Sequence, residues 1–201
     1  MIASVVLAAG GSFRLGQPKQ LLRQAGQPLV RRMAIAALEA GCAPVVVVVG
    51  NRSEEVAAAL ENLPLTIVPN DSWEQGIGSS IRAGIDALPE SDGAVLLACD
   101  QPSVDREVID SLIAAHNQTG LPIVASAYAG TLGIPALFAR EFYPALASLT
   151  GDHGAKSIIV AYRDQVAAVP FAAGVVDIDV LDDLRHLESD ELLAKRETES
   201  R

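Results

Sequence analysis

Five consecutive valines, Val45–Val49, constrain the fold of this chain more than any other stretch. Because β-branched side chains then lie on both faces of one strand, both faces need apolar cover, which is typical of a parallel sheet with helices on each side. Other short apolar runs are predicted as strands at 2–7, 65–68, 94–99 and 123–127, and an edge-like run lies at 166–169.

Stretches with helical spacing separate these strands. Helices are predicted at 29–40, 54–61, 79–88, 105–117, 140–149, 155–162 and 182–193, with Ser53 as the N-cap of the second. Strands that alternate with helices imply right-handed crossovers and an α/β fold: a single doubly wound, mostly parallel sheet with helices on both faces. We expect this domain to span residues 1–187, and the charge-dense tail 188–201 to fray.

The charge balance argues against several classes of partner. The chain carries 25 acidic and 15 basic residues, which gives a formal net charge of −10. Such an acidic chain is poorly suited to bind nucleic acid or an anionic membrane surface, and no apolar run is long enough to span a bilayer. Cys42 and Cys99 lack metal-binding spacing and are predicted to be buried free thiols. With no signal peptide before the first strand, we expect a cytoplasmic protein.

The segment 7–22, after the first predicted strand, has the composition of a polyphosphate-binding loop. Its small residues let backbone N–H groups approach a ligand closely, and we predict nucleotide contacts at Leu7, Ala8, Ala9, Gly10, Gly11 and Ser12. Arg14 and Lys19 supply countercharge. Gln17-Pro18 stands where the Walker motif has Lys-Ser/Thr, and the glycines do not form G-x-G-x-x-G. A plain strand-to-helix turn is the alternative, but it leaves the two cations unexplained.

The sequence L-A-A-G-G-S-F-R-L-G-Q-P-K-Q-L-L at 7–22 resembles the signature loop of nucleotidyltransferases. Its Pro-Lys-Gln-Leu-Leu ending resembles the MobA-like family and, within it, the molybdenum cofactor cytidylyltransferases. The resemblance extends over 2–187 and implies a Rossmann-like nucleotidyltransferase fold with Mg²⁺ as cofactor. It also implies that Arg14, Lys19 and Asp100 are catalytic: Arg14 would hold the β/γ-phosphates, Lys19 the α-phosphate and the attacking oxygen, and Asp100 the Mg²⁺.

Two aspartates are candidate metal ligands. Asp100 ends the apolar run 95–99, so its carboxylate is expected at the carboxyl tip of a strand, where one carboxylate plus phosphate oxygens and waters suffices for Mg²⁺. The alternative, that Asp100 caps the next helix, is disfavoured because Ser103 is better placed as the cap. Asp179 precedes the last predicted helix, and it is either a second metal contact or a helix cap.

The segment 70–82 is a second candidate nucleotide contact. It is a turn of small and polar residues that runs into a helix start, where free N–H groups bind a base or a phosphate. Gly78, Ser79 and Ser80 resemble a Gly-x-Gly-Ser-Ser stretch of the same family, which implies that Gly78 and Ser80 lie against the base, with Ala8 and Ala9 on its other side. An ordinary helix N-cap at Ser79 is the alternative.

Two later segments resemble family stretches that bind the second, pterin-bearing substrate. The resemblance implies contacts from Gly133, Pro135, Asp152, His153 and Lys156. The alternative for the second segment is a helix start with Asp152 as the N-cap. Ile134 departs from the family pattern, which commonly has His there, and this weakens the expectation for the second substrate.

The resemblance predicts an enzyme that transfers CMP from CTP to the terminal phosphate of molybdenum cofactor and releases pyrophosphate. Its expected partners are these small molecules and, transiently, a molybdoenzyme or its chaperone. The alternatives are a GTP-using relative, a cytidylyltransferase for another sugar or alcohol phosphate, and a non-catalytic nucleotide-binding module. A dinucleotide-dependent redox enzyme is a more distant alternative because its glycine fingerprint is missing.

Overall fold

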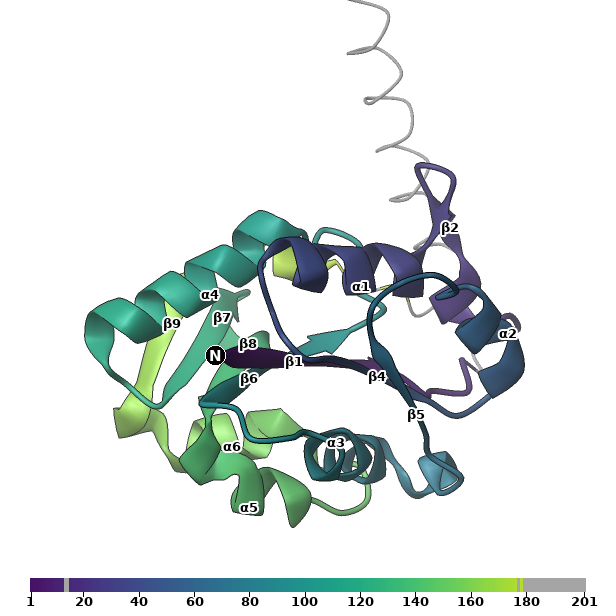
Figure 1. Ribbon diagram of the computed structural model, residues 1–201. Coiled ribbons are helices and arrows are strands. Elements are labelled where there is room, and N and C mark those ends of the chain that lie inside the picture. Colours follow the sequence, from purple (N-terminus) through teal and green to yellow (C-terminus); the bar gives the residue numbers. More distant parts are fainter. Residues whose placement is uncertain (13–14, 177, 179–201) are drawn as a thin grey trace, which may run out of the picture.

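A seven-stranded sheet lies at the centre of the computed structural model, which describes residues 1–12, 15–176 and 178 (Figure 1). Its strand order is β5-β4-β1-β6-β8-β7-β9, and only β8 runs antiparallel to its neighbours. The strands are β1 (Ile2–Ala8), β4 (Val45–Val49), β5 (Thr66–Pro69), β6 (Gly93–Ala98), β7 (Ile123–Tyr128), β8 (Thr131–Ala139) and β9 (Val166–Pro170). The predicted mostly parallel sheet is confirmed.

Helices cover both faces of the sheet (Figure 1). One face carries α1 (Leu29–Glu39), α2 (Ser53–Ala58) and α4 (Arg106–Thr119), and the other carries α3 (Ile77–Asp86), α5 (Tyr143–Ala147) and α6 (Ala155–Ala161). Within the described residues, no helix is both long enough and apolar enough to cross a membrane.

The shorter elements connect these layers. A two-stranded ribbon joins β2 (Arg23–Gln24) to β3 (Gln27–Pro28). The 3₁₀ turns are η1 (Lys19–Leu21), η2 (Trp73–Gln75), η3 (Arg140–Phe142), η4 (Arg163–Gln165) and η5 (Ala172–Val175).

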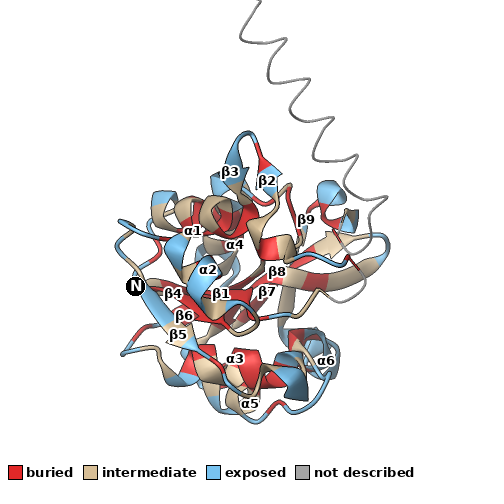
Figure 2. Ribbon diagram, turned by 90° about the vertical axis from the view of Figure 1, so that its right-hand side faces the viewer, coloured by how far each residue is buried: buried red, intermediate tan, exposed pale blue. Residues whose placement is uncertain are grey.

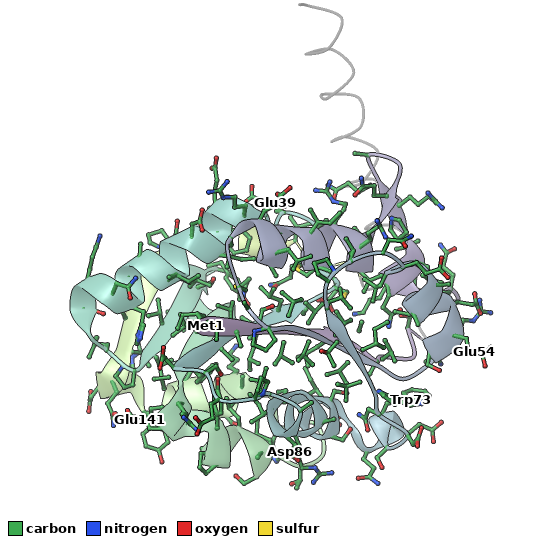
Figure 3. The ribbon with its side chains drawn as sticks, in the orientation of Figure 1. Met1, Glu39, Glu54, Trp73, Asp86 and Glu141 are labelled. Atoms are coloured by element: carbon green, nitrogen blue, oxygen red, sulfur yellow. The ribbon has the colours of Figure 1, made fainter. Side chains whose placement is uncertain are left out.

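The valine run packs as its composition predicts. Val45, Val47 and Val49 join the apolar cluster under α1, α2 and α4, whereas Val46 and Val48 join the cluster under α3, α5 and α6. All five side chains are buried, and Figure 2 shows buried residues concentrated in the sheet between the helical layers. Because side chains alternate between the faces of a strand, one valine run contributes to both cores.

Several predicted boundaries were wrong. Arg52, in the left-handed region at φ 52°, precedes α2, so Ser53 is its first residue rather than its N-cap. The N-cap of α4 is Asp105, whose carboxylate accepts a hydrogen bond from the Val108 N–H at 3.0 Å; Ser103 does not cap this helix. The helix predicted over 140–149 is a 3₁₀ turn followed by the short α5.

One strand of the central sheet was missed, as were the two short strands of the β2–β3 ribbon, and other predictions fall where the structure is not described. The segment 131–139, read from the sequence only as a substrate contact, forms β8 between β6 and β7. The helix predicted over 182–193 and the tail 188–201 lie outside the described residues.

Candidate active site

The carboxyl ends of β1 and β6 lie side by side, because Leu7 pairs with Ala98 in the parallel register. The residues that follow these strands, Gly10 and Gly11 after β1 and Asp100 after β6, therefore meet at one edge of the sheet. A cavity of about 320 Å³ opens there, as expected for ligand sites of open α/β sheets. It is also lined by Leu7, Ala9, Lys19, Gln20, Trp73, Glu74, Gly76, Ile77, Ser80, Ala98, Cys99 and Asp152.

Lys19 and Asp100 form an ion pair inside this cavity. The Nζ atom of Lys19 lies 2.5 Å from Oδ2 of Asp100, and the two side chains are 19% and 24% exposed. The backbone N–H of Lys19 also donates to the Ser12 hydroxyl at 3.0 Å, which ties η1 to the loop after β1. The structure thus brings together two of the three predicted catalytic residues, while Arg14 lies outside the described residues.

Gln20 is a site residue that sequence reasoning missed. Its side chain is buried, and its amide Nε2 donates to the carbonyl oxygens of Ala8 at 3.1 Å and Gly10 at 2.7 Å. The signals available in the sequence were its position directly after Lys19 and its place in the Pro-Lys-Gln-Leu-Leu ending.

The side chain of Ala8 does not face the cavity. Leu7 and Ala9 belong to the apolar cluster on the α3 side of the sheet, and both line the cavity. Ala8 points to the opposite face and packs in the cluster under α1, because side chains alternate along a strand. Ala9 therefore lines the cavity, whereas the Ala8 side chain does not, and the expected contact between Ala8 and a base stays a prediction.

Hydrogen bonds fix the segment 70–80 at the rim of the cavity. The amide Nδ2 of Asn70 donates to the hydroxyls of Ser79 at 2.9 Å and Ser80 at 3.0 Å. The Ser79 hydroxyl lies within bonding distance of the carbonyls of Ser72 and Gly76, so it holds the turn and does not line the cavity. Ser80 does line it. The N-cap of α3 is Gly76, not Ser79.

Gly78 packs against a neighbouring turn rather than the cavity. A Cβ atom there would lie 2.8 Å from the backbone nitrogen of Thr150, and the Gly78 N–H donates to the Gly151 carbonyl at 3.0 Å. The small side chain is required for this close backbone approach. The structure thus gives Gly78 a packing role, and its expected contact with a base stays a prediction.

The residues predicted for the second substrate do not form one group. Asp152 joins the nucleotide segment at the cavity, since its Oδ1 would lie 2.7 Å from a Cβ atom on Gly76. Asp152 is not the N-cap of α6, because Gly154 occupies that position. His153 and Lys156 are exposed and do not line the cavity.

Gly133 and Pro135 lie within β8, away from these residues in the chain. A Cβ atom on Gly133 would contact the Tyr128 hydroxyl, and the Pro135 carbonyl accepts a hydrogen bond from the buried Ser126 hydroxyl at 2.7 Å. Neither residue lines the cavity. Their contacts instead join β8 to the neighbouring strand β7.

The donor set at the cavity fits a magnesium ion bound together with a nucleotide. Within the described residues no cluster of three or more His, Cys, Asp or Glu side chains forms a metal cage. Magnesium does not need one, because one or two carboxylates plus phosphate oxygens and waters satisfy it. Asp100 supplies such a carboxylate, whereas Asp179, the second predicted ligand, lies outside the described residues.

Neither cysteine is a candidate nucleophile. Burial raises the pKa of the Cys99 thiol far above its ordinary value, and the Asp100 carboxylate next to it adds to the rise. Burial likewise raises the pKa of the Cys42 thiol to about 12. Both are free thiols and both are buried, as predicted, so they stay protonated near neutral pH and are poor nucleophiles.

A doubly wound sheet with a Gly-containing loop and a Lys–Asp pair at its carboxyl edge defines a Rossmann-like nucleotide-binding α/β protein. The solved structure of a homologue of Mycobacterium tuberculosis Rv0371c, from Mycobacterium sp. strain JC1, has the same fold. It superimposes with a TM-score of 0.82 at 32% identity, over 96% of this chain and 98% of the other.

The family is shown by sequence. The chain belongs to the family of MobA-like NTP transferase domains, whose model matches residues 4–166. Nicotine blue oxidoreductase of Paenarthrobacter nicotinovorans is 35% identical over 165 residues, which cover 77% of this chain and 79% of that protein. The bifunctional protein GlmU of Syntrophotalea carbinolica is 39% identical over 121 residues, 59% of this chain but only 26% of that longer protein.

A metal complex also occurs among the structural neighbours. The structure of Rv0371c from Mycobacterium tuberculosis H37Rv in complex with manganese superimposes with a TM-score of 0.76 at 28% identity. The match covers 92% of this chain and 97% of the other.

Proposed function

We propose that this chain is a divalent-metal-dependent cytidylyltransferase that transfers CMP from CTP to the terminal phosphate of molybdopterin. An oxygen of that phosphate attacks the α-phosphorus of CTP in line, a P–O bond forms, and the bond to pyrophosphate breaks. The observation that carries the proposal is the Lys19–Asp100 pair beside the Gly10-Gly11 loop in a cavity at the carboxyl edge of the sheet. The product would pass to a molybdoenzyme or its chaperone.

The residues of the cavity suit this transfer because it needs alignment and charge neutralisation rather than a protein nucleophile. Lys19 orients the α-phosphate and balances the charge that develops on its oxygens. Asp100 would hold Mg²⁺, which when bound neutralises phosphate charge. Arg14, from the sequence resemblance, holds the leaving pyrophosphate. The manganese complex of the 28%-identical Rv0371c supports a divalent-metal site.

The other lining residues suit a compact base that carries an amino group. Trp73 and Ile77 offer apolar surface, and Ala9 leaves room on the α3 side of the sheet. The carboxylates of Glu74 and Asp152 accept hydrogen bonds and donate none. The 4-amino group of cytosine donates to such acceptors, whereas the 4-carbonyl of uracil is repelled by them, which favours CTP over UTP.

A redox reaction is the second candidate function, because one relative of this chain is an oxidoreductase. Because the 35%-identical protein is a nicotine blue oxidoreductase, an oxidation–reduction reaction in the same cavity is the competing proposal. The missing G-x-G-x-x-G fingerprint and the Lys19–Asp100 pair favour nucleotidyl transfer.

A paired assay tests the two functions. In one assay the protein is mixed with CTP and Mg²⁺, with and without molybdopterin. In the other it is mixed with NADPH and a redox dye. Pyrophosphate release from CTP that depends on molybdopterin supports the proposal. Consumption of NADPH by the dye, with no pyrophosphate released from CTP, would replace it with the redox function.

A further inference from the structure

Gln20 is a large polar side chain in an unusual place. It is 1% exposed and sits in η1 directly after Lys19, at the cavity wall. Glutamine is mostly found at protein surfaces, so a fully buried one needs hydrogen-bond partners that compensate for lost water.

The partners of Gln20 are two carbonyls of the loop after β1. Its Nε2 donates one hydrogen bond to the Ala8 oxygen and one to the Gly10 oxygen, at 3.1 and 2.7 Å. Its Oε1 has no partner within the described residues, although it is buried. The glutamine is therefore held by its two donors alone, and its acceptor is left unsatisfied, which is unfavourable.

The hydrogen bond from Gln20 to the Gly10 carbonyl fixes the orientation of the peptide between Gly10 and Gly11. In the planar trans peptide between Gly10 and Gly11, the C=O and N–H bonds point in opposite directions. Since the Gly10 carbonyl points to Gln20, the Gly11 N–H points away from it. The N–H groups of Gly10 and Gly11 find no acceptor among the described residues, and both glycines line the cavity.

We propose that Gln20 is a positioning residue that shapes the loop after β1 into an anion site. By holding the Gly10 carbonyl, it turns the Gly11 N–H away from itself and leaves that N–H available to the phosphate chain of the nucleotide. The neighbouring Gly10 N–H belongs to the Ala9 peptide, whose carbonyl accepts a hydrogen bond from the Asn51 N–H at 3.1 Å. This role rests on the proposed function, because it assigns Gln20 to the pyrophosphate part of the same site.

A neutral double donor suits this position. A carboxylate at residue 20 would repel both carbonyls, and an aliphatic side chain would leave them free to turn toward the phosphates. Because Gln20 and Lys19 share one 3₁₀ turn, and Ser12 accepts from the Lys19 N–H at 3.0 Å, the same contacts set the distance between the lysine and the loop.

The test uses the variants Gln20→Met and Gln20→Glu, with Gln27→Met as the matched control at an exposed position of β3. Calorimetry measures the affinity for inorganic pyrophosphate with Mg²⁺, and NMR titration measures the affinity for cytidine. Both Gln20 variants should bind pyrophosphate about ten- to a hundredfold more weakly, the range expected when contacts to a charged group are lost. Cytidine binding should change less than twofold, and Gln27→Met should match the wild type for both probes.

The outcomes separate this inference from the proposed function. Wild-type binding of CTP and pyrophosphate with no loss in either Gln20 variant would overturn the role of Gln20 alone. Equal loss of both probes would also overturn it, because a general collapse of the cavity then explains the data. A wild type that binds neither CTP nor pyrophosphate would overturn the proposed function and this inference with it. If Gln20→Met does not fold, the isosteric Gln20→Glu decides.

Discussion

The ammonium of Lys19 and the carboxylate of Asp100 lie 2.5 Å apart, although 81 positions separate them in the chain. Each offsets the charge of the other, because a charge that is largely removed from water and unpaired is strongly unfavourable. In the proposed reaction both change partners: Lys19 turns to a phosphate and Asp100 to a cation. The ion pair holds the two charged groups side by side at the cavity.

Asp100→Asn tests the metal role of this carboxylate. Asparagine keeps the shape, so the fold should persist, but the site loses its charged ligand. We expect turnover to fall by roughly 10²–10³-fold, the typical effect of removing one preorganised electrostatic contact. Steady-state pyrophosphate release checks this, with Asp164→Asn at an exposed position of η4 as the control. Turnover within a few-fold of the wild type at ordinary Mg²⁺ would remove Asp100 from the reaction.

Nucleotide preference is a separate prediction. We expect CTP with Mg²⁺ to raise the melting temperature more than GTP, ATP or UTP at equal concentration, since ligands stabilise the folded state in proportion to their affinity. The physical reasons are the limited cavity and the acceptors Glu74 and Asp152 along its wall. A larger shift with GTP would contradict the choice of CTP but leave nucleotidyl transfer intact.

The buried thiols predict a pH dependence of stability. Burial raises the pKa of Cys42 from 9.0 to about 12, so above pH 9 the unfolded chain releases a proton that the folded chain retains. Stability therefore falls as pH rises: this thiol contributes a loss on the order of 1 kcal/mol between pH 8 and pH 10. Urea unfolding of the wild type and Cys42→Ala at both values measures it. A wild type that loses no more stability than the variant would contradict the shift.

The sequence predicted the parts of this protein that depend on local pattern. The valine run, the loop at 7–22 and the strand-end position of Asp100 all rest on periodicity or short motifs. The predicted placement agrees with the structure for the valine run, for Asp100 and for the part of the loop that the structure describes. The strand β8 was missed because Gly133 and Pro135 weaken a strand signal, and the pairing with β6 and β7 overrides that local preference.

Contacts between distant segments could not be predicted in the same way. The burial of Gln20, the position of Asp152 against Gly76 and the packing of Gly78 on Thr150 each depend on how two remote turns meet. The periodicity of a single sequence gives no information on contacts between turns that lie far apart in the chain. Family resemblance assigned Gly78 to the base and Asp152 to the second substrate. It gave no sign that Gly78 packs on Thr150 or that Asp152 lies against Gly76.

Packing and ligand contact at α3 can be separated by two variants. In Gly78→Ala the new methyl group meets the backbone of Thr150, so we expect a loss of about 1–3 kcal/mol in stability, typical of overpacking. Ser80→Ala removes a hydroxyl that lines the cavity, while Asn70 keeps its hydrogen bond to Ser79. Its main effect should be weaker CTP binding. Urea unfolding and CTP calorimetry on both proteins check this, and a Gly78→Ala protein of unchanged stability would contradict the packing role.

The last prediction concerns the lysine of the loop. The turn η1 and the hydrogen bond from its N–H to Ser12 fix the backbone of Lys19 beside the loop. In the proposed reaction its charge should therefore act mostly in the transition state. Lys19→Ala should therefore lower kcat and kcat/KM together, with a smaller change in KM for CTP. Arg23, exposed in β2 and bonded to the Gly26 carbonyl at 2.6 Å, is the control cation. Steady-state kinetics of the Lys19→Ala and Arg23→Ala variants check this. An equal fall in kcat/KM for Arg23→Ala would contradict a specific role of Lys19 and favour a diffuse basic surface.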